Sequence, residues 1–145
     1  TKTAGWYTEG TQIIFAAGGG ILYSAIASAD EADGKLIGVD VDQSSVSERI
    51  ITSAMKELEG SVKLALTDLL NNGGVWSATY AGVETKLGAA QDCVGLPTDS
   101  ASWKFSTFTV EQYDEVFAKV KSGEIAVSNA IDVAPTVAIT VDYQN

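Results

Sequence analysis

Histidine is absent from this chain of 145 residues. Histidine is the commonest general base and the commonest metal ligand in proteins, so its absence removes the usual route to acid-base catalysis and metal binding. Nucleophilic sites of the Ser-His-Asp or Cys-His type cannot form within the chain. The single cysteine, Cys93, cannot form an internal disulfide, and it therefore neither requires nor excludes an oxidising compartment.

Basic residues are also scarce. Nine lysines and arginines stand against nineteen acidic residues, which gives a formal net charge of -10. Proteins that bind DNA, RNA or acidic membranes need clustered basic residues, so this balance argues against all three partners. No apolar run approaches the ~20 residues of a membrane span, and no signal peptide is seen. Residues 5–7 read as the middle of a helix, so we expect sequence upstream of Thr1 and treat the chain as a fragment.

The chain does contain two apolar segments that end in residues able to touch a ligand. Residues 13–17 and 36–41 are runs bounded by glycine or acid, a pattern typical of buried parallel strands. Between them, helical spacing is seen for Ile21, Leu22, Ala25, Ile26 and Ala29. These segments predict a βαβ unit with a right-handed crossover, in which both strands end at the edge where α/β folds bind small molecules.

Further strands are expected at residues 49–54, 79–83 and 93–96. The tail, 129–145, alternates apolar side chains from Val137 to Tyr143 and reads either as an edge strand or as a linker. We therefore expect a single α/β domain of three layers, with a mainly parallel sheet of about five strands.

Two more helices are expected. One begins near Leu58 and ends at 71–74, and its predicted buried stripe consists of Leu58, Val62, Ala65, Leu66 and Leu69. The other begins with a capping box at Thr109 and ends at Gly123. Its predicted buried face consists of Val110, Tyr113, Val116, Phe117 and Val120.

The glycine triplet at 18–20 is followed, twenty positions later, by Asp40, which mimics part of the dinucleotide-binding fingerprint. The match is incomplete, because Leu22 and Tyr23 stand where the pattern needs a further glycine. The glycines fit equally well as a tight turn that allows close helix packing. In either case, the helix that starts near Gly20 presents free backbone donors at the ligand edge.

Asp40 and Asp42 flank the end of the second strand. Two carboxylates would repel a phosphate but accept hydrogen bonds from a sugar diol, so they favour a neutral ligand rich in hydroxyls. A calcium loop is a poor alternative, because Ser45 and Ile51 occupy the positions that need glycine and a bidentate acid. The alternative without a ligand makes Asp40 a surface acid and Asp42 a loop cap.

Phe15 follows two isoleucines near the end of the first predicted strand, and Lys56 comes just beyond the third predicted strand. An aromatic face at the mouth of a crevice can stack on a base for about 1–3 kcal/mol. The ammonium group of Lys56 could donate to a sugar oxygen or a base nitrogen. The alternatives are that Phe15 belongs to the core and that Lys56 is an ordinary solvated lysine.

Four blocks of the sequence closely resemble the carboxyl-terminal half of the basic membrane lipoprotein family: 13–20, 36–43, 52–56 and 87–97. The Phe-Ala-Ala-Gly-Gly and Gly-Val-Asp-x-Asp-Gln motifs within the first two are specific to that family. The resemblance extends from Trp6 to about Ser128. Members of the family are substrate-binding proteins of ABC importers, and they include the purine nucleoside receptors.

The resemblance implies a type I periplasmic-binding-protein fold, of which residues 1–145 form the carboxyl-terminal lobe without its partner lobe. The ligand lies in the cleft between the lobes. The positions that match the family's contacts are Phe15, Ala17, Gly18, Gly20, Asp40 and Lys56. By this match, Phe15 stacks on the purine, Asp40 takes the ribose hydroxyls, and Lys56 also reaches the ligand. No cofactor and no metal are implied.

The function expected from this resemblance is binding without catalysis. The protein captures a purine nucleoside and presents it to the membrane permease of an ABC importer. It lies at the extracellular face of the cell membrane or in the periplasm, held by a lipid anchor on the missing amino-terminal part. Two alternatives stay open: a sugar-binding regulator or sensor lobe of the same fold, and a nucleotide-dependent enzyme domain that uses residues 18–20 as a phosphate turn.

Overall fold

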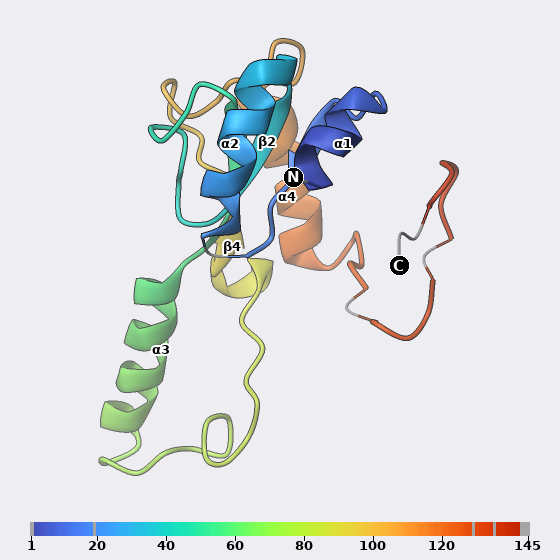
Figure 1. Cartoon of the computed structure of the whole chain (residues 1–145). Helices are drawn as coiled ribbons and strands as arrows, with labels where there is room; N and C mark the ends of the chain where they lie inside the picture. Colours follow the sequence, from blue (N-terminus) through green and yellow to red (C-terminus); the bar gives the residue numbers. More distant parts are fainter. Residues whose placement is uncertain (1, 19, 129, 135, 143–145) are drawn as a thin grey trace.

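The computed structural model describes residues 2–18, 20–128, 130–134 and 136–142. The elements follow one another as α1 (Lys2–Thr8), β1 (Ile13–Phe15), α2 (Ile21–Ala32), β2 (Lys35–Asp40), β3 (Ile50–Lys56), α3 (Leu58–Asn71), the 3-10 helix η1 (Ala89–Gln91), β4 (Val94–Gly95) and α4 (Val110–Ser122). Figure 1 shows their arrangement, with α3 extending away from the remaining elements.

Within the described residues, the sheet has four strands in the order β1-β2-β3-β4. β1 pairs with β2 and β2 with β3 in parallel, whereas the short β4 is antiparallel to the end of β3. The predicted α/β class and the mainly parallel sheet are therefore confirmed. The βαβ unit is present as β1-α2-β2.

The strand predicted at 79–83 is wrong, so the sheet has four strands and not about five. This segment consists of turns, in which the backbone N–H groups of Tyr80 and Ala81 both donate to the carbonyl oxygen of Ser77, at 3.0 and 2.8 Å. The Ser77 hydroxyl in turn donates to Asp68 of α3 at 2.9 Å. Local bonds of this kind offer the backbone an alternative to a strand ladder, and they override the β-propensity of the segment.

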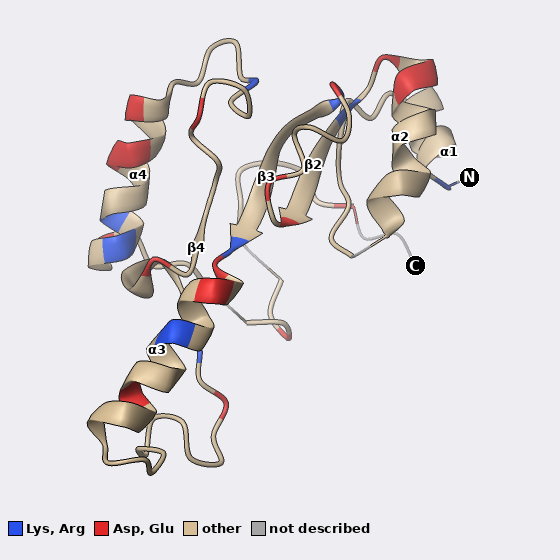
Figure 2. Cartoon of the chain, turned by 90° about the vertical axis from the view of Figure 1, so that its left-hand side faces the viewer, with Lys and Arg blue, Asp and Glu red and all other residues tan. Residues whose placement is uncertain are grey.

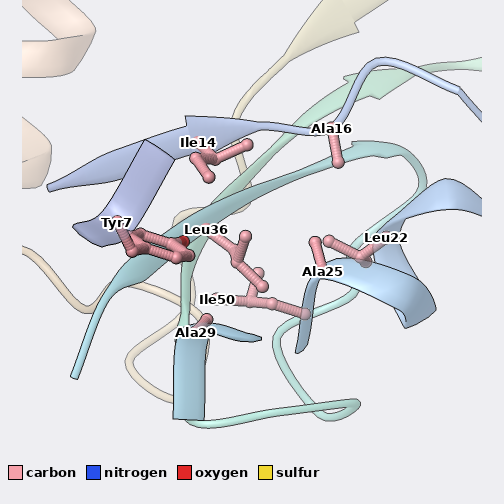
Figure 3. Packing of buried hydrophobic residues seen from close by; sticks show 8 residues of the cluster. All are labelled: Tyr7, Ile14, Ala16, Leu22, Ala25, Ala29, Leu36 and Ile50. Atoms are coloured by element: carbon pink, nitrogen blue, oxygen red, sulfur yellow. The ribbon is translucent and has the colours of Figure 1, made fainter. Parts of the chain in front are cut away.

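The core lies between one face of the sheet and the helices α1 and α2. Its buried residues are Tyr7, Ile14, Ala16, Leu22, Ala25, Ala29, Leu36 and Ile50, and Figure 3 shows the side chains of β1, β2 and β3 meeting those of the two helices. Small side chains at 25 and 29 let α2 approach the sheet closely. Just after α2, a Cβ atom at Gly34 would lie 2.2 Å from the ring of Tyr7, so only glycine fits there.

The other face of the sheet looks toward α4, and Figure 2 shows α4 and α2 on opposite sides of β2 and β3. The predicted capping box is confirmed, since Thr109 accepts from the Gln112 backbone and Gln112 accepts from the Thr109 backbone. Gly123 ends the helix at φ +79°. The predicted buried face is only half-buried: no residue of α4 is fully buried, and of the five predicted positions Val116 is exposed while the other four are half-buried.

The helix α3 is also confirmed, but its predicted buried stripe is wrong. No residue of α3 is buried, and Leu58, Val62 and Leu66 are exposed. The apolar spacing correctly predicts a helix. Among the described residues, however, no surface packs against the apolar side of α3. In the tail, residues 136–142 form no strand, and Tyr143 lies outside the described residues. No helix of the described part has the length and apolar character needed to cross a membrane.

Candidate ligand-binding site

Three of the predicted site residues are the last residues of neighbouring parallel strands. Phe15 ends β1, Asp40 ends β2 and Lys56 ends β3. Because these strands run in the same direction, the three side chains project from the same edge of the sheet. This is the edge at which open α/β sheets bind ligands.

A cavity of about 460 Å³ lies beside this edge, between the sheet and α4. Ligand pockets commonly have volumes of roughly 300–1,000 Å³. Three predicted site residues, Phe15, Ala17 and Lys56, line the cavity. The sheet contributes Val39 and Ala54 to its floor.

Strand alternation places Phe15 in the cavity and its neighbour in the core. Ile14 is 8% exposed and packs against α2, whereas Phe15 is 50% exposed. Successive side chains of a strand point to opposite faces, so Phe15 faces away from the core. The alternative that Phe15 belongs to the core is therefore wrong. Its ring offers an apolar surface to the cavity.

Asp40 and Lys56 form an ion pair, with 2.9 Å between Asp40 Oδ1 and Lys56 Nζ. Both side chains remain substantially exposed, at 41% and 61%. Asp40 does not line the cavity that contains Phe15; it lines an adjoining hollow, and Lys56 lines both. The lysine thus connects the apolar cavity with the carboxylate.

Asp42 has a different role from Asp40. Its carboxylate accepts from the Ser44 backbone at 2.9 Å, from the Ser44 hydroxyl at 3.0 Å and from the Ser102 hydroxyl at 2.5 Å. Burial tends to raise the pKa of Asp42, but the hydrogen bonds from Ser102 and Ser44 and the charge of Lys104 outweigh it and hold the pKa below its ordinary value. The alternative in which Asp42 caps its loop is confirmed. Sequence reasoning missed Ser102, which lies 58 residues from Ser44 in the chain.

Gly18 and Gly20 follow at the same edge but do not line the cavity. A Cβ atom at Gly18 would lie 2.9 Å from Cδ1 of Ile21, the far end of an exposed and flexible side chain that can move aside. Gly20 directly precedes α2, and a Cβ atom there would meet nothing within 4 Å. Gly19 lies outside the described residues. Neither the surroundings of Gly18 nor those of Gly20 require glycine, so the tight-turn interpretation stays a prediction.

Sequence reasoning also missed the wall that faces the sheet. Tyr113 and Phe117 of α4 line the cavity, with their rings stacked 5.4 Å apart at 24°. The hydroxyl oxygen of Tyr113 accepts from the backbone N–H of Leu96 at 3.0 Å. The spacing of the aromatic residues on α4 predicts a core stripe, and no local pattern marks these residues as the wall of a cavity. Among the described residues, no group of three or more acidic or cysteine side chains gathers in a way that could hold a metal ion.

The comparisons with known proteins agree with this fold. A family model described as ABC transporter substrate-binding protein PnrA-like matches residues 3–130. A solved structure of ABC transporter system solute-binding proteins from Aeropyrum pernix K1 is similar in fold, with 18% sequence identity and a TM-score of 0.62. The similarity covers 90% of this chain and 44% of that one, so this chain spans less than half of its structural relative. No curated protein matches the chain.

Proposed function

The chain belongs to the family of PnrA-like ABC transporter substrate-binding proteins, and from this premise we propose that it is one lobe of a protein that binds a purine nucleoside for import. The observation that carries the proposal is the convergence of Phe15, Asp40 and Lys56 at the ends of three parallel strands. A flat ring and a pair of opposite charges together suit a ligand that has an aromatic base and a polyol.

The chemistry divides between the apolar cavity and the ion pair. The half-exposed ring of Phe15 would stack on the base, a contact worth about 1–3 kcal/mol. Asp40 would accept hydrogen bonds from the ribose hydroxyls, and Lys56 would donate to a ligand oxygen or nitrogen. Because the ion pair is already formed and is open to solvent, the hydroxyls would add to it without leaving a buried charge unpaired.

The site on this chain is half of a binding cleft. The cavity is open, and the relative with the same fold is more than twice as long as the part that matches. A second lobe would close over the ligand and exclude water, which strengthens stacking and hydrogen bonding. The whole protein would deliver its ligand to a membrane permease from the outer side of the membrane, held there by a lipid anchor, without catalysing a reaction.

Calorimetric titration of the complete two-lobed protein tests the proposal. Inosine, guanosine and adenosine should bind more tightly than cytidine, and all of them more tightly than ribose, which has no base to stack. Ribose bound as tightly as inosine would instead support a sugar-binding lobe. Tight binding of a dinucleotide would support the enzyme alternative.

The isolated chain provides a second test. It should give no measurable heat with inosine at ordinary concentrations, because one face of the ligand stays in water. A micromolar dissociation constant for the isolated chain would contradict the half-site.

A further inference from the structure

Asp40 lies at the tip of a strained turn. Its φ is +69°, in the left-handed region that residues other than glycine rarely adopt. The backbone N–H of Val41 donates to the carbonyl oxygen of Val39 at 2.9 Å, which closes a three-residue γ-turn around Asp40. Turns of this kind with positive φ are uncommon, and they persist only where surrounding contacts hold them.

Gln43 supplies such a contact. Its side-chain oxygen accepts from the backbone N–H of Val39 at 2.8 Å. β1 pairs with β2 only as far as Ile37, two residues before Val39. The Gln43 amide therefore takes the place of a strand carbonyl beyond the end of β1, and it holds the first residue of the γ-turn.

Gln43 is itself anchored to the buried part of the sheet. Its backbone N–H donates to the hydroxyl of Ser53 at 3.0 Å, and Ser53 is fully buried in β3. Gln43 and Ser53 can meet over β2 because residue 38, which lies beneath them, is glycine and has no side chain. A Cβ atom at Gly38 would lie 2.6 Å from the Ser53 hydroxyl and 2.8 Å from the Gln43 side-chain oxygen.

We propose that Gln43 is a positioning residue for the ligand site, which holds the γ-turn so that the carboxylate of Asp40 faces the ribose hydroxyls. The inference rests on the proposed function, because it assigns Asp40 to the ligand. The residues after the turn add a second support, since Asp42 is bound to Ser44 and Ser102. Asp40 is thus fixed on both sides while its own side chain stays exposed.

The experiment compares Gln43→Met, which removes the acceptor at similar size, with Gln43→Glu, which keeps it. Each variant of the complete two-lobed protein is titrated with inosine and with 2′,3′-dideoxyinosine, which lacks both hydroxyls. Gln43→Met should weaken inosine binding about tenfold and leave dideoxyinosine binding nearly unchanged. Gln43→Glu should restore discrimination between the two. If Gln43 served only general stability, its loss would weaken the binding of both ligands alike. An unchanged ratio of inosine affinity to dideoxyinosine affinity in Gln43→Met therefore overturns the inference.

Gln91→Met is the matched control. The side-chain oxygen of Gln91 accepts from the backbone N–H of Gly88 at 3.0 Å, so this variant removes a similar contact away from the cavity and the ion pair. It should not change the ratio of the two affinities. A change as large as that of Gln43→Met would also overturn the inference.

Hydrogen exchange at Val41 tests the turn without a ligand. Protection of its amide should fall in Gln43→Met and persist in Gln43→Glu, because this amide closes the γ-turn. Unchanged protection in Gln43→Met overturns the inference whatever the protein binds. If the unaltered protein binds no nucleoside while the exchange result holds, the proposed function fails, and with it the part of the inference that assigns Asp40 to ribose.

Discussion

The two faces of the sheet differ in what covers them. On one face, α2 packs Leu22, Ala25 and Ala29 against the strands, and each of these residues is at most 1% exposed. On the other face, the cavity separates the sheet from α4. The helix α3 extends away from the other elements and buries no residue. Both α2 and α3 follow a parallel strand, and both have an apolar stripe. Spacing therefore predicts a helix and the residues that share one face, but it does not predict whether a surface covers that face.

The two helices also differ in the contacts that hold them. The stability of α2 comes from burial against distant residues, which is the usual source for helices in proteins. The described contacts of α3 are mainly local: Lys63 pairs with Glu59 at 2.5 Å, and the Ser61 hydroxyl donates to the carbonyl of Leu58 at 2.7 Å. Exposed pairs of this kind contribute only about 0.3–0.5 kcal/mol.

The largest expected effect is a contrast between one leucine in each helix. Leu22→Ala should lower the free energy of unfolding by about 2–5 kcal/mol, because Leu22 is fully buried. Leu66→Ala should change it by no more than about 0.5 kcal/mol, because Leu66 is 49% exposed. Urea denaturation of the 145-residue chain measures both. Similar losses in the two variants would show that α3 is packed against another surface in solution.

A smaller effect separates the neighbours Ile14 and Phe15, which lie on opposite faces of β1. Phe15→Ala should reduce nucleoside affinity by about 1–3 kcal/mol, the value of one base stack, with little change in melting temperature. Phe15→Tyr should keep the affinity. Ile14→Ala should do the reverse, since it opens a cavity in the core and leaves the ligand edge intact.

Ile13→Ala controls for the loss of apolar surface on the face that carries Phe15. Ile13 is 48% exposed and does not line the cavity. Ile13→Ala should leave both the nucleoside affinity and the melting temperature nearly unchanged. A Phe15→Ala protein that melts several degrees early but binds normally would exclude the stacking role.

The sequence predicted the features that depend on local patterns. The capping box at Thr109 and the existence of the first three strands, with ends within two residues of those observed, follow from residues close together in the chain. The turn around Asp40 could not be predicted in this way, because its positive φ is held by contacts that involve Gln43 and, across the sheet, Ser53. The exposure of α3 could not be predicted either, because burial depends on what the rest of the fold places beside it.

The Asp42 cluster was only half predictable for the same reason. Its bond to Ser44 is a local turn contact that the Asp-x-Ser spacing favours. Its bond to Ser102 joins residues 60 apart, and no local pattern marks such a partner. The hydrogen bond from Ser102 to Asp42 connects the segment that leads into α4 with the end of β2.

The smallest expected effect concerns this tie between the sheet and the side that carries α4. Asp42→Asn should lower the free energy of unfolding at neutral pH by less than about 1 kcal/mol, because the carboxylate is partly exposed and water screens it. The folded protein holds the pKa of Asp42 below 3.8, its ordinary value. The stabilisation is therefore fully present above that value and is lost as the pH falls through the lower folded pKa.

Urea denaturation from about pH 7 down to about pH 2.5 checks this dependence. The gap between the unaltered protein and Asp42→Asn should be widest at neutral pH and should narrow in acid. Asp114→Asn makes the same charge change at an exposed position of α4, and at neutral pH it should show a smaller gap than Asp42→Asn. A gap for Asp42→Asn that widens in acid would mean that the carboxylate is stabilised by its proton in the folded state. The hydrogen bonds from Ser44 and Ser102 to the ionised carboxylate would then not be the source of the stabilisation.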